Sequence, residues 1–324
     1  ETSWDLTGDE SVVSVVALDT GGYAVVRARG SIQFVGADGV VIADEVAGGK
    51  RLVDQTATVS TGGIIAADVD GRVTRWDSRG EMVNDVTSFV AGRINDVAVS
   101  ADGHVAAAAA SDGNVALLAL SDTSPNESMQ QRFAHPEGNV DSVAFVPDGT
   151  AVVSGVSEAN GTNSFDDTLS RWEVSNDERL FAVGGIPEPI MGCTEFRNTV
   201  LVAPGGEFFV APFHDFSVSI RDTGDGSVIH EFPEPISIVW DLSISDDGRR
   251  LATSSDDWTV RVWDLDDYTL ISEIETRPGG FLEVEFLPDG RSLVVSDISG
   301  KVHLLDIESE SVTATFDGEK DPEA

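Results

Sequence analysis

The sequence predicts an all-β protein, a seven-bladed β-propeller with four antiparallel strands in each blade. Three observations lead to this fold class. Residues 247–264 have the pattern of two short strands, because β-branched and aromatic residues flank an Asp-rich turn. Weaker copies of this stretch recur about every 42 residues, which is the length of a four-stranded blade. The apolar content of 41% supports a packed interior.

The repeat is visible at the position of Trp263, near the end of the third strand of its copy. The equivalent positions are Val35, Trp76, Leu118, Trp172, Arg221, Trp263 and Leu305, with gaps of 41, 42, 54, 49, 42 and 42 residues. A Gly-Gly or Asp-Gly pair precedes the second strand of every copy, where it favours a tight turn. Seven copies in register predict seven blades within a single domain, residues 1–324.

The predicted blades follow one another along the chain. Their approximate ranges are 12–46, 52–89, 93–133, 139–183, 193–232, 236–275 and 280–316. Closing such a ring removes the exposed sheet edges that would otherwise promote aggregation. We expect residues 312–316 to supply the outer strand of the seventh blade, with Trp4–Leu6 as the alternative.

Four stretches carry a family motif: His135–Gly149, Leu251–Leu265, Arg75–Asp77 and Arg171–Glu173. From about residue 10 to residue 316, the chain resembles the WD-repeat (WD40) β-propeller family, in a divergent form of prokaryotic type. The resemblance implies a rigid ring that binds proteins or peptides.

The resemblance also implies a structural tetrad of His, Ser or Thr, Asp and Trp in each complete blade. In the fourth copy the matching residues are His135, Ser154, Asp167 and Trp172. In the sixth copy Asp257 and Trp263 match, but no His precedes them. The first, third, fifth and seventh copies lack the Trp, so we expect apolar packing alone to hold those blades together.

The net charge of −37 is extreme for 324 residues. Such a surface repels nucleic-acid phosphates and anionic membranes, so neither is expected as a partner. The carboxylates are scattered along the chain, which favours adaptation to high salt over an acidic binding tract.

No stretch approaches the 20 or so apolar residues of a membrane span. Cys193 is the single cysteine, so an intrachain disulfide is excluded.

Known catalytic motifs are missing from the sequence. It has no HExxH, no GxSxG elbow, no phosphate-binding loop and no dinucleotide fingerprint. The five His residues lack zinc-like spacing, and the Asp-rich turns at 164–167 and 255–257 lack EF-hand spacing. We therefore expect no enzyme activity, no cofactor and no metal site, with calcium in an Asp-rich turn as the alternative.

The resemblance points to one face of the ring as the binding surface. In this family the connections between blades and the turns between second and third strands share a face, here called the top face. Two insertions, at about 157–166 and 186–191, map to it, although a third, 122–127, maps to the opposite face. The candidate partner-binding residues are Asn95, Ser111, Asp141, Asp166, His214, Trp240, Asp256, Trp258 and Leu282. Trp240 stands out because aromatic anchors dominate interface energetics, although packing between blades would also explain it.

Three functions remain open at this stage. The first is a non-catalytic scaffold or sensor that binds a protein or peptide on the top face. The second is a propeller that binds a small ligand or metal in its central channel, and the third is a structural assembly subunit. The chain begins at Glu1 without Met, so we expect it to be part of a larger polypeptide or complex. The compartment stays open between the cytoplasm, slightly favoured, and an extracytoplasmic domain.

Overall fold

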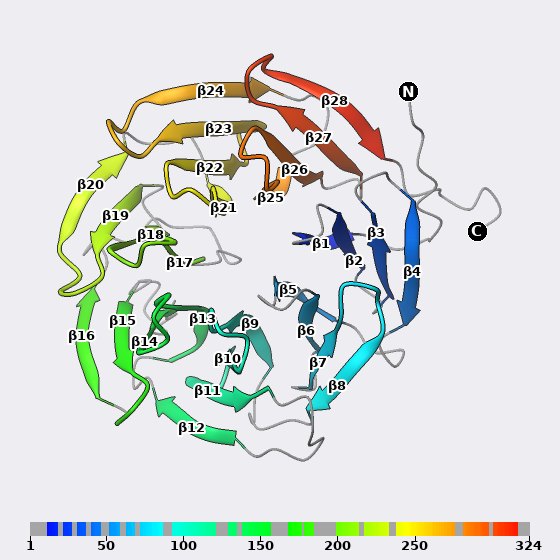
Figure 1. The fold of residues 1–324 in the computed structure, drawn as a ribbon. Coiled ribbons are helices and arrows are strands. Elements are labelled where there is room, and N and C mark those ends of the chain that lie inside the picture. Colours follow the sequence, from blue (N-terminus) through cyan, green and yellow to red (C-terminus); the bar gives the residue numbers. More distant parts are fainter. Residues whose placement is uncertain are drawn as a thin grey trace.

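The computed structural model shows a ring of seven four-stranded sheets around a central axis (Figure 1). The structure describes residues 12–18, 22–27, 31–36, 40–46, 52–58, 63–68, 72–86, 93–120, 129–134, 138–156, 168–176, 178–184, 199–213, 217–232, 238–275, 281–297 and 301–316. Every helix or strand element among these residues is a strand, so the prediction of an all-β, seven-bladed propeller is confirmed.

The first three blades are built from strands β1 to β12. Blade one consists of β1 (Val12–Ala17), β2 (Tyr23–Arg27), β3 (Ser31–Val35) and β4 (Val41–Val46). Blade two consists of β5 (Leu52–Thr58), β6 (Ile64–Asp68), β7 (Val73–Trp76) and β8 (Met82–Val86). Blade three consists of β9 (Ile94–Val99), β10 (Val105–Ala110), β11 (Asn114–Ala119) and β12 (Met129–Ala134).

The last four blades are built from strands β13 to β28. Blade four consists of β13 (Val140–Phe145), β14 (Ala151–Val156), β15 (Thr168–Glu173) and β16 (Arg179–Gly184). Blade five consists of β17 (Leu201–Val202), β18 (Phe208–Pro212), β19 (Val218–Asp222) and β20 (Val228–Phe232). Blade six consists of β21 (Val239–Ile244), β22 (Arg250–Ser255), β23 (Thr259–Asp264) and β24 (Leu270–Glu275). Blade seven consists of β25 (Phe281–Phe286), β26 (Ser292–Asp297), β27 (Val302–Asp306) and β28 (Ser311–Phe316).

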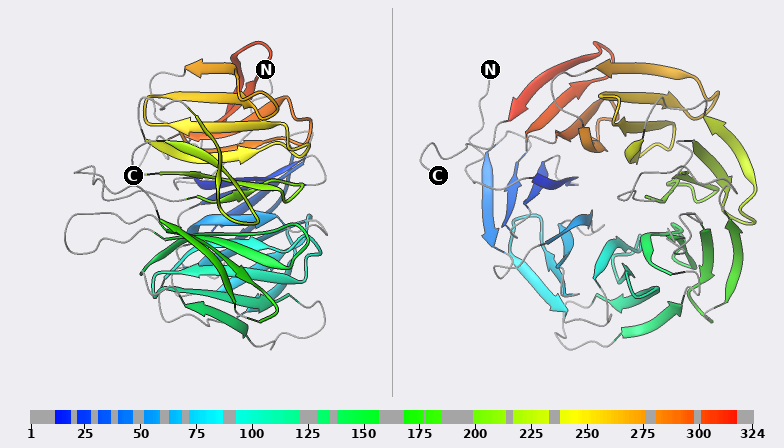
Figure 2. Two further views of the ribbon diagram at one scale, coloured as in Figure 1. Left: turned by 90° about the vertical axis from the view of Figure 1, so that its left-hand side faces the viewer. Right: turned by 180° about the vertical axis from the view of Figure 1, so that it is seen from behind.

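Within each blade the strands pair antiparallel in chain order, from the first strand at the axis to the fourth on the outside (Figure 1). The side view shows that the strands run along the ring axis, from one face to the other (Figure 2). Strand β28 pairs with β27 and completes blade seven, so the expected role of residues 312–316 is confirmed. The alternative segment, Trp4–Leu6, lies outside the described residues.

The stretch that revealed the repeat forms the β22–β23 hairpin of blade six. Leu251 pairs with Trp263 across the two strands. At the turn, Asp257 Oδ1 accepts hydrogen bonds from Thr259 N at 3.1 Å and from Thr259 Oγ1 at 2.6 Å. A short acidic side chain can close a reverse turn by accepting from the backbone two residues on, which explains Asp at this position.

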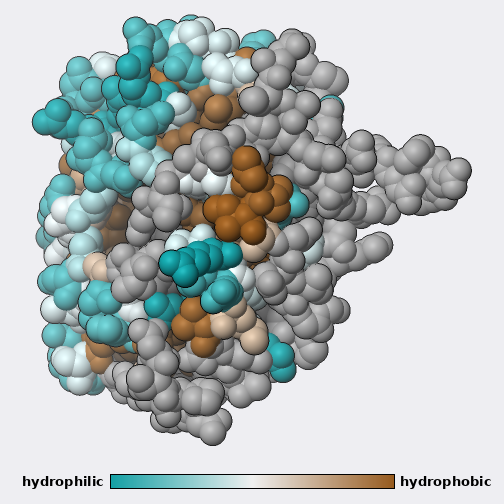
Figure 3. All heavy atoms as spheres, turned by 45° about the vertical axis from the view of Figure 1, so that its right-hand side comes forward, coloured by the Kyte–Doolittle hydropathy of each residue, from teal (hydrophilic) through white to brown (hydrophobic). Residues whose placement is uncertain are grey.

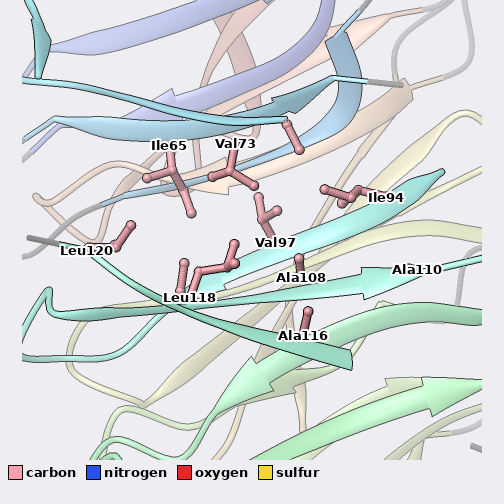
Figure 4. Packing of buried hydrophobic residues seen from close by; sticks show 11 residues of the cluster. Ile65, Val73, Ile94, Val97, Ala108, Ala110, Ala116, Leu118 and Leu120 are labelled. Atoms are coloured by element: carbon pink, nitrogen blue, oxygen red, sulfur yellow. The ribbon is translucent and has the colours of Figure 1, made fainter. Parts of the chain in front are cut away.

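The hydrophobic core is divided into seven clusters, and each cluster lies between two neighbouring blades. Between blades two and three, for example, Ile65 and Val73 point toward Val97 and Leu118 (Figure 4). Strand β10 is almost entirely alanine: its even-numbered alanines pack toward blade two and its odd-numbered ones toward blade four. Small side chains on both faces let adjacent sheets approach closely and still pack without voids.

Blade seven meets blade one by side-chain packing. Among the described residues, each sheet takes its four strands from one continuous segment of the chain, and no described strand is shared between the first and last blades. Val294 and Val302 of blade seven pack instead against Tyr23, Val25 and Val35 of blade one. The closure of the ring therefore depends on apolar burial at this junction.

Two β-bulges recur from blade to blade. The inner bulge falls near the start of the first strand, at Val13, Asn95, Asp141, Trp240 and Leu282. The outer bulge falls at the second or third residue of the fourth strand, at Ile42, Val83, Gln130, Leu180, Ile229, Ile271 and Thr313. A bulge leaves one residue without a partner in the ladder and redirects its side chain. The repeat therefore sets two specialised positions in a blade, one near the axis and one on the perimeter.

The turn between the third and fourth strands packs against the fourth strand of the preceding blade. Gly80 has a φ of +81°, and a Cβ there would lie only 2.5 Å from the Cβ of Ala43 in blade one. At the equivalent turn of blade six, Tyr268 has a φ of 62° and stacks on His230 of blade five with ring centroids 4.1 Å apart. The same contact is thus made with side chains of very different size.

Candidate functional site

Hydrogen bonds join the start of the first strand to the turn between the second and third strands of the same blade. In blade three, Ser111 N donates to Arg93 O at 2.8 Å, and Arg93 N donates to Ser111 Oγ at 2.9 Å. In blade six, Asp256 N donates to Ile238 O at 2.9 Å. These contacts hold the Ser111 turn against Arg93, two residues before Asn95, and the Asp256 turn against Ile238, two residues before Trp240.

Four of the residues predicted from the sequence occupy the inner bulge. They are Asn95, Asp141, Trp240 and Leu282. The side chains of the first three are partly exposed, whereas that of Leu282 lies outside the described part of the structure. Because bulges redirect side chains and are frequent beside binding sites, this shared position is a physical reason to regard the column as a candidate contact surface.

A chain of amide and carboxylate groups crosses from blade three to blade four. Asn95 Nδ2 donates to Asn139 Oδ1 at 2.9 Å and to Val140 O at 2.7 Å. Asn139 Nδ2 in turn donates to Asp141 Oδ1 at 2.5 Å. These contacts fix the orientation of two predicted site residues, Asn95 and Asp141. The sequence analysis did not identify Asn139, which precedes its bulge by two positions.

Trp258 has an unusual backbone for a bulky residue. Its φ is 68°, in the left-handed region, and its exposed fraction is 41%. The equivalent residue of blade three is Gly113, with a φ of 83°. The two turns match, since Trp258 N donates to Ser255 O at 3.1 Å and Gly113 N donates to Ala110 O at 3.1 Å. Glycine adopts this conformation freely, whereas a tryptophan is strained in it.

The structure brings together half of the tetrad proposed for blade four. Trp172 Nε1 donates to Ser154 Oγ at 3.1 Å, and both side chains are buried. The other two members, His135 and Asp167, lie outside the described residues. The Trp172 ring also stacks on Phe133 of blade three, with centroids 5.4 Å apart, so this tryptophan joins two blades.

In blade six the aspartate of the tetrad pattern pairs with an arginine of the same hairpin. Arg261 Nη2 lies 2.8 Å from Asp257 Oδ2, and Arg261 Nε lies 2.8 Å from Glu273 Oε2. Burial of the Asp257 carboxylate raises its pKa. Hydrogen bonds from Thr259 and Arg261, together with the positive charge of Arg261, lower it by more, so the pKa of Asp257 lies below its ordinary value. Trp263 packs separately, 5.0 Å from the ring of Phe232 in blade five.

Two blades that lack the tryptophan are held by polar contacts as well, so the expectation of apolar packing alone is wrong for them. In blade five, Arg221 Nη1 donates to Gly226 O at 3.1 Å, and the guanidinium lies 5.1 Å from the Phe213 ring centroid. In blade seven, His303 Nε2 lies 2.9 Å from Asp297 Oδ2. A missing tryptophan therefore does not imply a missing polar network.

Side chains directly after the inner bulges connect neighbouring blades. Asp96 Oδ2 accepts a hydrogen bond from Val143 N of blade four at 2.9 Å. Asp241 Oδ2 accepts the equivalent bond from Val284 N of blade seven, also at 2.9 Å. Ser142 occupies the same position in blade four. The sequence analysis missed this column, although its polar residues are in register with the bulge residues that it identified.

Two carboxyl groups close to the axis have raised pKa values. Burial raises the pKa of Asp96 to about 6, against hydrogen bonds from Val143, Ser142 and Val97 that lower it. Burial also raises the pKa of Glu285 to about 8; repulsion from Asp241 adds to the shift, and a hydrogen bond from Ser243 opposes it. Ser243 Oγ and Glu285 Oε2 are 3.2 Å apart. Glu285 therefore binds a proton near neutral pH.

Several predicted features lie outside the described residues: Asp166, His214, the insertions at 157–166 and 186–191, and the turn at 164–167. Within the described ranges, no group of three His, Cys, Asp or Glu side chains is arranged to hold a metal ion. In those same ranges, no helix has the length and apolar character needed to cross a membrane.

The fold defines a class of protein, the seven-bladed β-propeller with four-stranded blades. Within that class, the family described as WD40 (WD domain, G-beta repeat) matches residues 127–173 and 226–264. These segments contain much of blades four and six and parts of blades three and five. Two segments of the ring thus match WD40 repeats, which supports a WD40 β-propeller family for this fold.

Three curated proteins illustrate the similarity. Periodic tryptophan protein 2 homolog of Schizosaccharomyces pombe is 29% identical over 125 residues, which are 38% of this chain and 15% of that protein. Actin-interacting protein 1 of Drosophila melanogaster is 23% identical over 261 residues, 76% of this chain and 39% of that protein. Meiotic recombination protein rec14 of Schizosaccharomyces pombe is 26% identical over 164 residues, 49% of this chain and 52% of that protein. The matches thus span between 15% and 52% of these relatives' own length.

Proposed function

We propose that the chain is a non-catalytic interaction scaffold or sensor that binds a protein or peptide partner on its top face. Trp258 carries this proposal. A large aromatic ring, 41% exposed, is held in a strained backbone conformation where blade three has glycine. Strain of this kind persists mainly at functional sites, and exposed tryptophans are frequent energetic anchors of interfaces.

The surroundings of Trp258 fit a partner-binding surface. Asp256 is exposed in the same turn, and Trp240 is partly exposed at the inner bulge of the same blade. Blades three and four contribute a polar section of the surface, made of Asn95, Ser111 and Asp141. By sequence position, Asp166, His214 and Leu282 extend the proposed surface. Non-catalytic scaffolding is the general role of WD40 propellers, and one relative, Actin-interacting protein 1, is named for a protein interaction.

The test uses a phage-displayed library of random peptides selected on the immobilised full chain. We expect the selected peptides to lose at least about tenfold in affinity on Trp258→Asn, because truncating an aromatic hot-spot residue typically removes about 2 kcal/mol or more. Asn is chosen because it tolerates a left-handed backbone. The matched control is Ile42→Thr, which removes an exposed apolar side chain from the outer strand of blade one.

Two outcomes would contradict the proposal. One is a selection that enriches no peptide. The other is a set of peptides that bind Trp258→Asn and the unaltered chain equally well.

A further inference from the structure

The perimeter of the ring carries a second kind of exposed surface. In five blades the outer bulge residue is a large aliphatic side chain that is exposed. These residues are Ile42 (50%), Val83 (42%), Leu180 (39%), Ile229 (46%) and Ile271 (39%). Aliphatic side chains on the solvent side of an edge strand do not stabilise the blade that carries them, and they promote association.

Exposed aliphatic residues gather in two places. The one–two patch consists of Val40, Val41, Ile42, Met82 and Val83 on blades one and two. Figure 3 shows hydrophobic side chains in two groups, separated by hydrophilic atoms, on the side of the ring where β4 and β8 lie. The five–six patch consists of Val228, Ile229, Leu270 and Ile271 on blades five and six.

The two halves of the five–six patch are held against each other by aromatic packing. Tyr268, which precedes Leu270 by two residues, stacks on His230 of blade five with ring centroids 4.1 Å apart and an interplanar angle of 7°. Phe232 packs against the edge of the same His230 ring at 5.0 Å. The patch therefore spans a fixed junction between two blades and does not depend on a flexible segment.

Charge distinguishes the two patches. The segments that carry the five–six patch, residues 222–232 and 264–275, contain eight Asp and Glu residues and no Lys or Arg. Six of these acids are exposed: Asp225, Glu231, Asp266, Asp267, Glu273 and Glu275. The equivalent segments of the one–two patch, residues 36–46 and 77–86, contain six Asp and Glu residues and one arginine, the exposed Arg79, so the five–six patch is the more acidic of the two. Glu273 is paired with Arg261, and the other exposed acids keep the border predominantly acidic. An apolar centre with such a border is complementary to an apolar surface flanked by Lys or Arg.

A second copy of this chain is a poor occupant of the five–six patch. Four aliphatic side chains exposed to this extent offer a few hundred Å², whereas a stable interface needs about 800 Å² on each partner. Two copies, each with a net charge of −37, would also bring acidic borders together. A single amphipathic segment matches the patch in both size and charge.

We propose that the five–six patch is a docking site for a cationic amphipathic segment of a partner protein. The aliphatic face of the segment packs on Ile229 and Ile271, and its Lys or Arg residues pair with the acidic border. The site lies on the perimeter and is separate from the top-face surface around Trp258.

The probe is a synthetic helical peptide of about 14 residues with leucines on one face and lysines on the others. Its dissociation constant for the full chain is measured by fluorescence anisotropy at about 0.1 M salt. We expect Ile229→Thr/Ile271→Thr to weaken binding at least about fivefold. The matched control, Ile42→Thr/Val83→Thr, removes two outer-bulge residues of similar exposure and should change binding less than about twofold.

Further arms separate the alternatives. A peptide with Glu in place of Lys, and one with Ser in place of Leu, should both bind at least about tenfold more weakly. A photo-crosslinking derivative of the lysine peptide should label residues 228–231 and 270–275 of the unaltered chain. This arm needs no variant, so it still tests the proposal if a variant folds poorly. Trp258→Asn should leave the affinity unchanged, so this proposal and the proposed top-face function can fail independently.

Four results would overturn the docking site. These are equal binding of the serine peptide, an equal effect of the two Thr double variants, crosslinks confined to other blades, and self-association of the chain that Ile229→Thr/Ile271→Thr abolishes. The last result would assign the patch to an interface between copies. Flotation with neutral or anionic lipid vesicles that depends on Ile229 and Ile271 would likewise replace the proposal with a membrane contact.

Discussion

At the scale of single residues, Trp258 combines a strained backbone with a large exposed ring. Its left-handed φ of 68° is stabilised by the tight turn between β22 and β23, in which Trp258 N donates to Ser255 O. The direct equivalent in blade three is Gly113, which also has a left-handed φ. The turn would therefore form more readily without the tryptophan, as expected if the ring serves the binding proposed above.

The strain at Trp258 can be measured by comparing two truncations. Trp258→Ala and Trp258→Asn remove nearly the same packing, but alanine keeps the left-handed penalty and asparagine largely avoids it. We expect the Asn variant to be more stable than the Ala variant by about 1 kcal/mol in denaturant unfolding. Asp266, an exposed turn residue of blade six with an ordinary backbone, provides a control site where Ala and Asn should differ less. Equal stability of the two Trp258 variants would contradict the interpretation of strain.

Because the pKa of Glu285 is raised, the free energy of unfolding should depend on pH, and replacing Glu285 should remove this dependence. Its pKa is about 8 in the folded protein, whereas an unperturbed glutamate has a pKa of 4.5, so folding favours the protonated form. The stability that Glu285 contributes is complete below pH 4.5 and is lost as the pH rises toward 8. Relative to the unaltered chain, Glu285→Gln should therefore gain stability between these pH values, on the order of 2 kcal/mol at pH 8.

The expected gain is smaller than the change in pKa alone would produce, because part of the Glu285 residue remains accessible to solvent. Denaturant unfolding at pH 5, 6.5 and 8 measures the change. Glu81→Gln, at an exposed turn of blade two, is the control and should show no such trend. A constant difference between Glu285→Gln and the unaltered chain across this range would show that Glu285 is ionised throughout.

At the scale of strands, hydrogen bonds from side chains reinforce the junctions between blades. Asp96 of β9 bonds to Val143 N of β13, and Ser142 of β13 bonds to Val200 N, just before β17, at 2.8 Å. The acceptor in each case is the residue directly after the inner bulge. The residue after each of these bulges is thus placed against the neighbouring blade.

Ser142→Ala tests this arrangement. The substitution leaves the Val200 N–H without its acceptor in a buried position, which should cost about 1–3 kcal/mol of folding free energy. It also removes a hydrogen bond that lowers the pKa of Asp96, so that pKa should rise further. Thermal and denaturant unfolding measure the first effect. Ser175→Ala, at an exposed turn of the same blade, should change stability by less than about 0.5 kcal/mol.

The sequence was sufficient to predict the blades because their signals are local. Asp-Gly turns, alternating strands and a spacing of about 42 residues depend on neighbours in the chain, and they set the number of blades and the outer strand β28. The inner bulge positions were also found, because they align with the repeat. The pairing of Arg261 with Asp257 was missed, since the family pattern directs attention to a histidine.

Contacts between blades were the least predictable part of the site. The stacking of Tyr268 on His230, and the bonds from Asp96 and Ser142, join residues about 38 to 58 positions apart whose individual identities follow no motif. The apolar patches on the perimeter were missed for another reason. Pairs such as Val228-Ile229 look like ordinary strand residues, and only the outer bulge shows that both face solvent.

At the scale of the whole molecule, seven similar interfaces share the stabilisation of the ring. Each apolar cluster joins two adjacent blades, so no blade buries its core alone. The junction between blades seven and one has the same kind of packing as the others, through Val294 and Val302 against Tyr23, Val25 and Val35. Any force that expands the ring therefore acts on all seven interfaces together.

Electrostatic repulsion is such a force, and it leads to a prediction about salt. With a net charge of −37, the ring is under like-charge repulsion that salt screens, and the screening length falls from about 10 Å at 0.1 M to about 3 Å at 1 M. We expect the melting temperature to rise steadily as potassium chloride increases from about 0.05 to 2 M. The control is the same titration near the sequence pI of about 4.1, where the net charge vanishes and most of the salt effect should vanish with it. A melting temperature that does not change with salt at neutral pH would exclude adaptation to high salt, and an equal rise at both pH values would attribute the effect to salting-out of apolar surface.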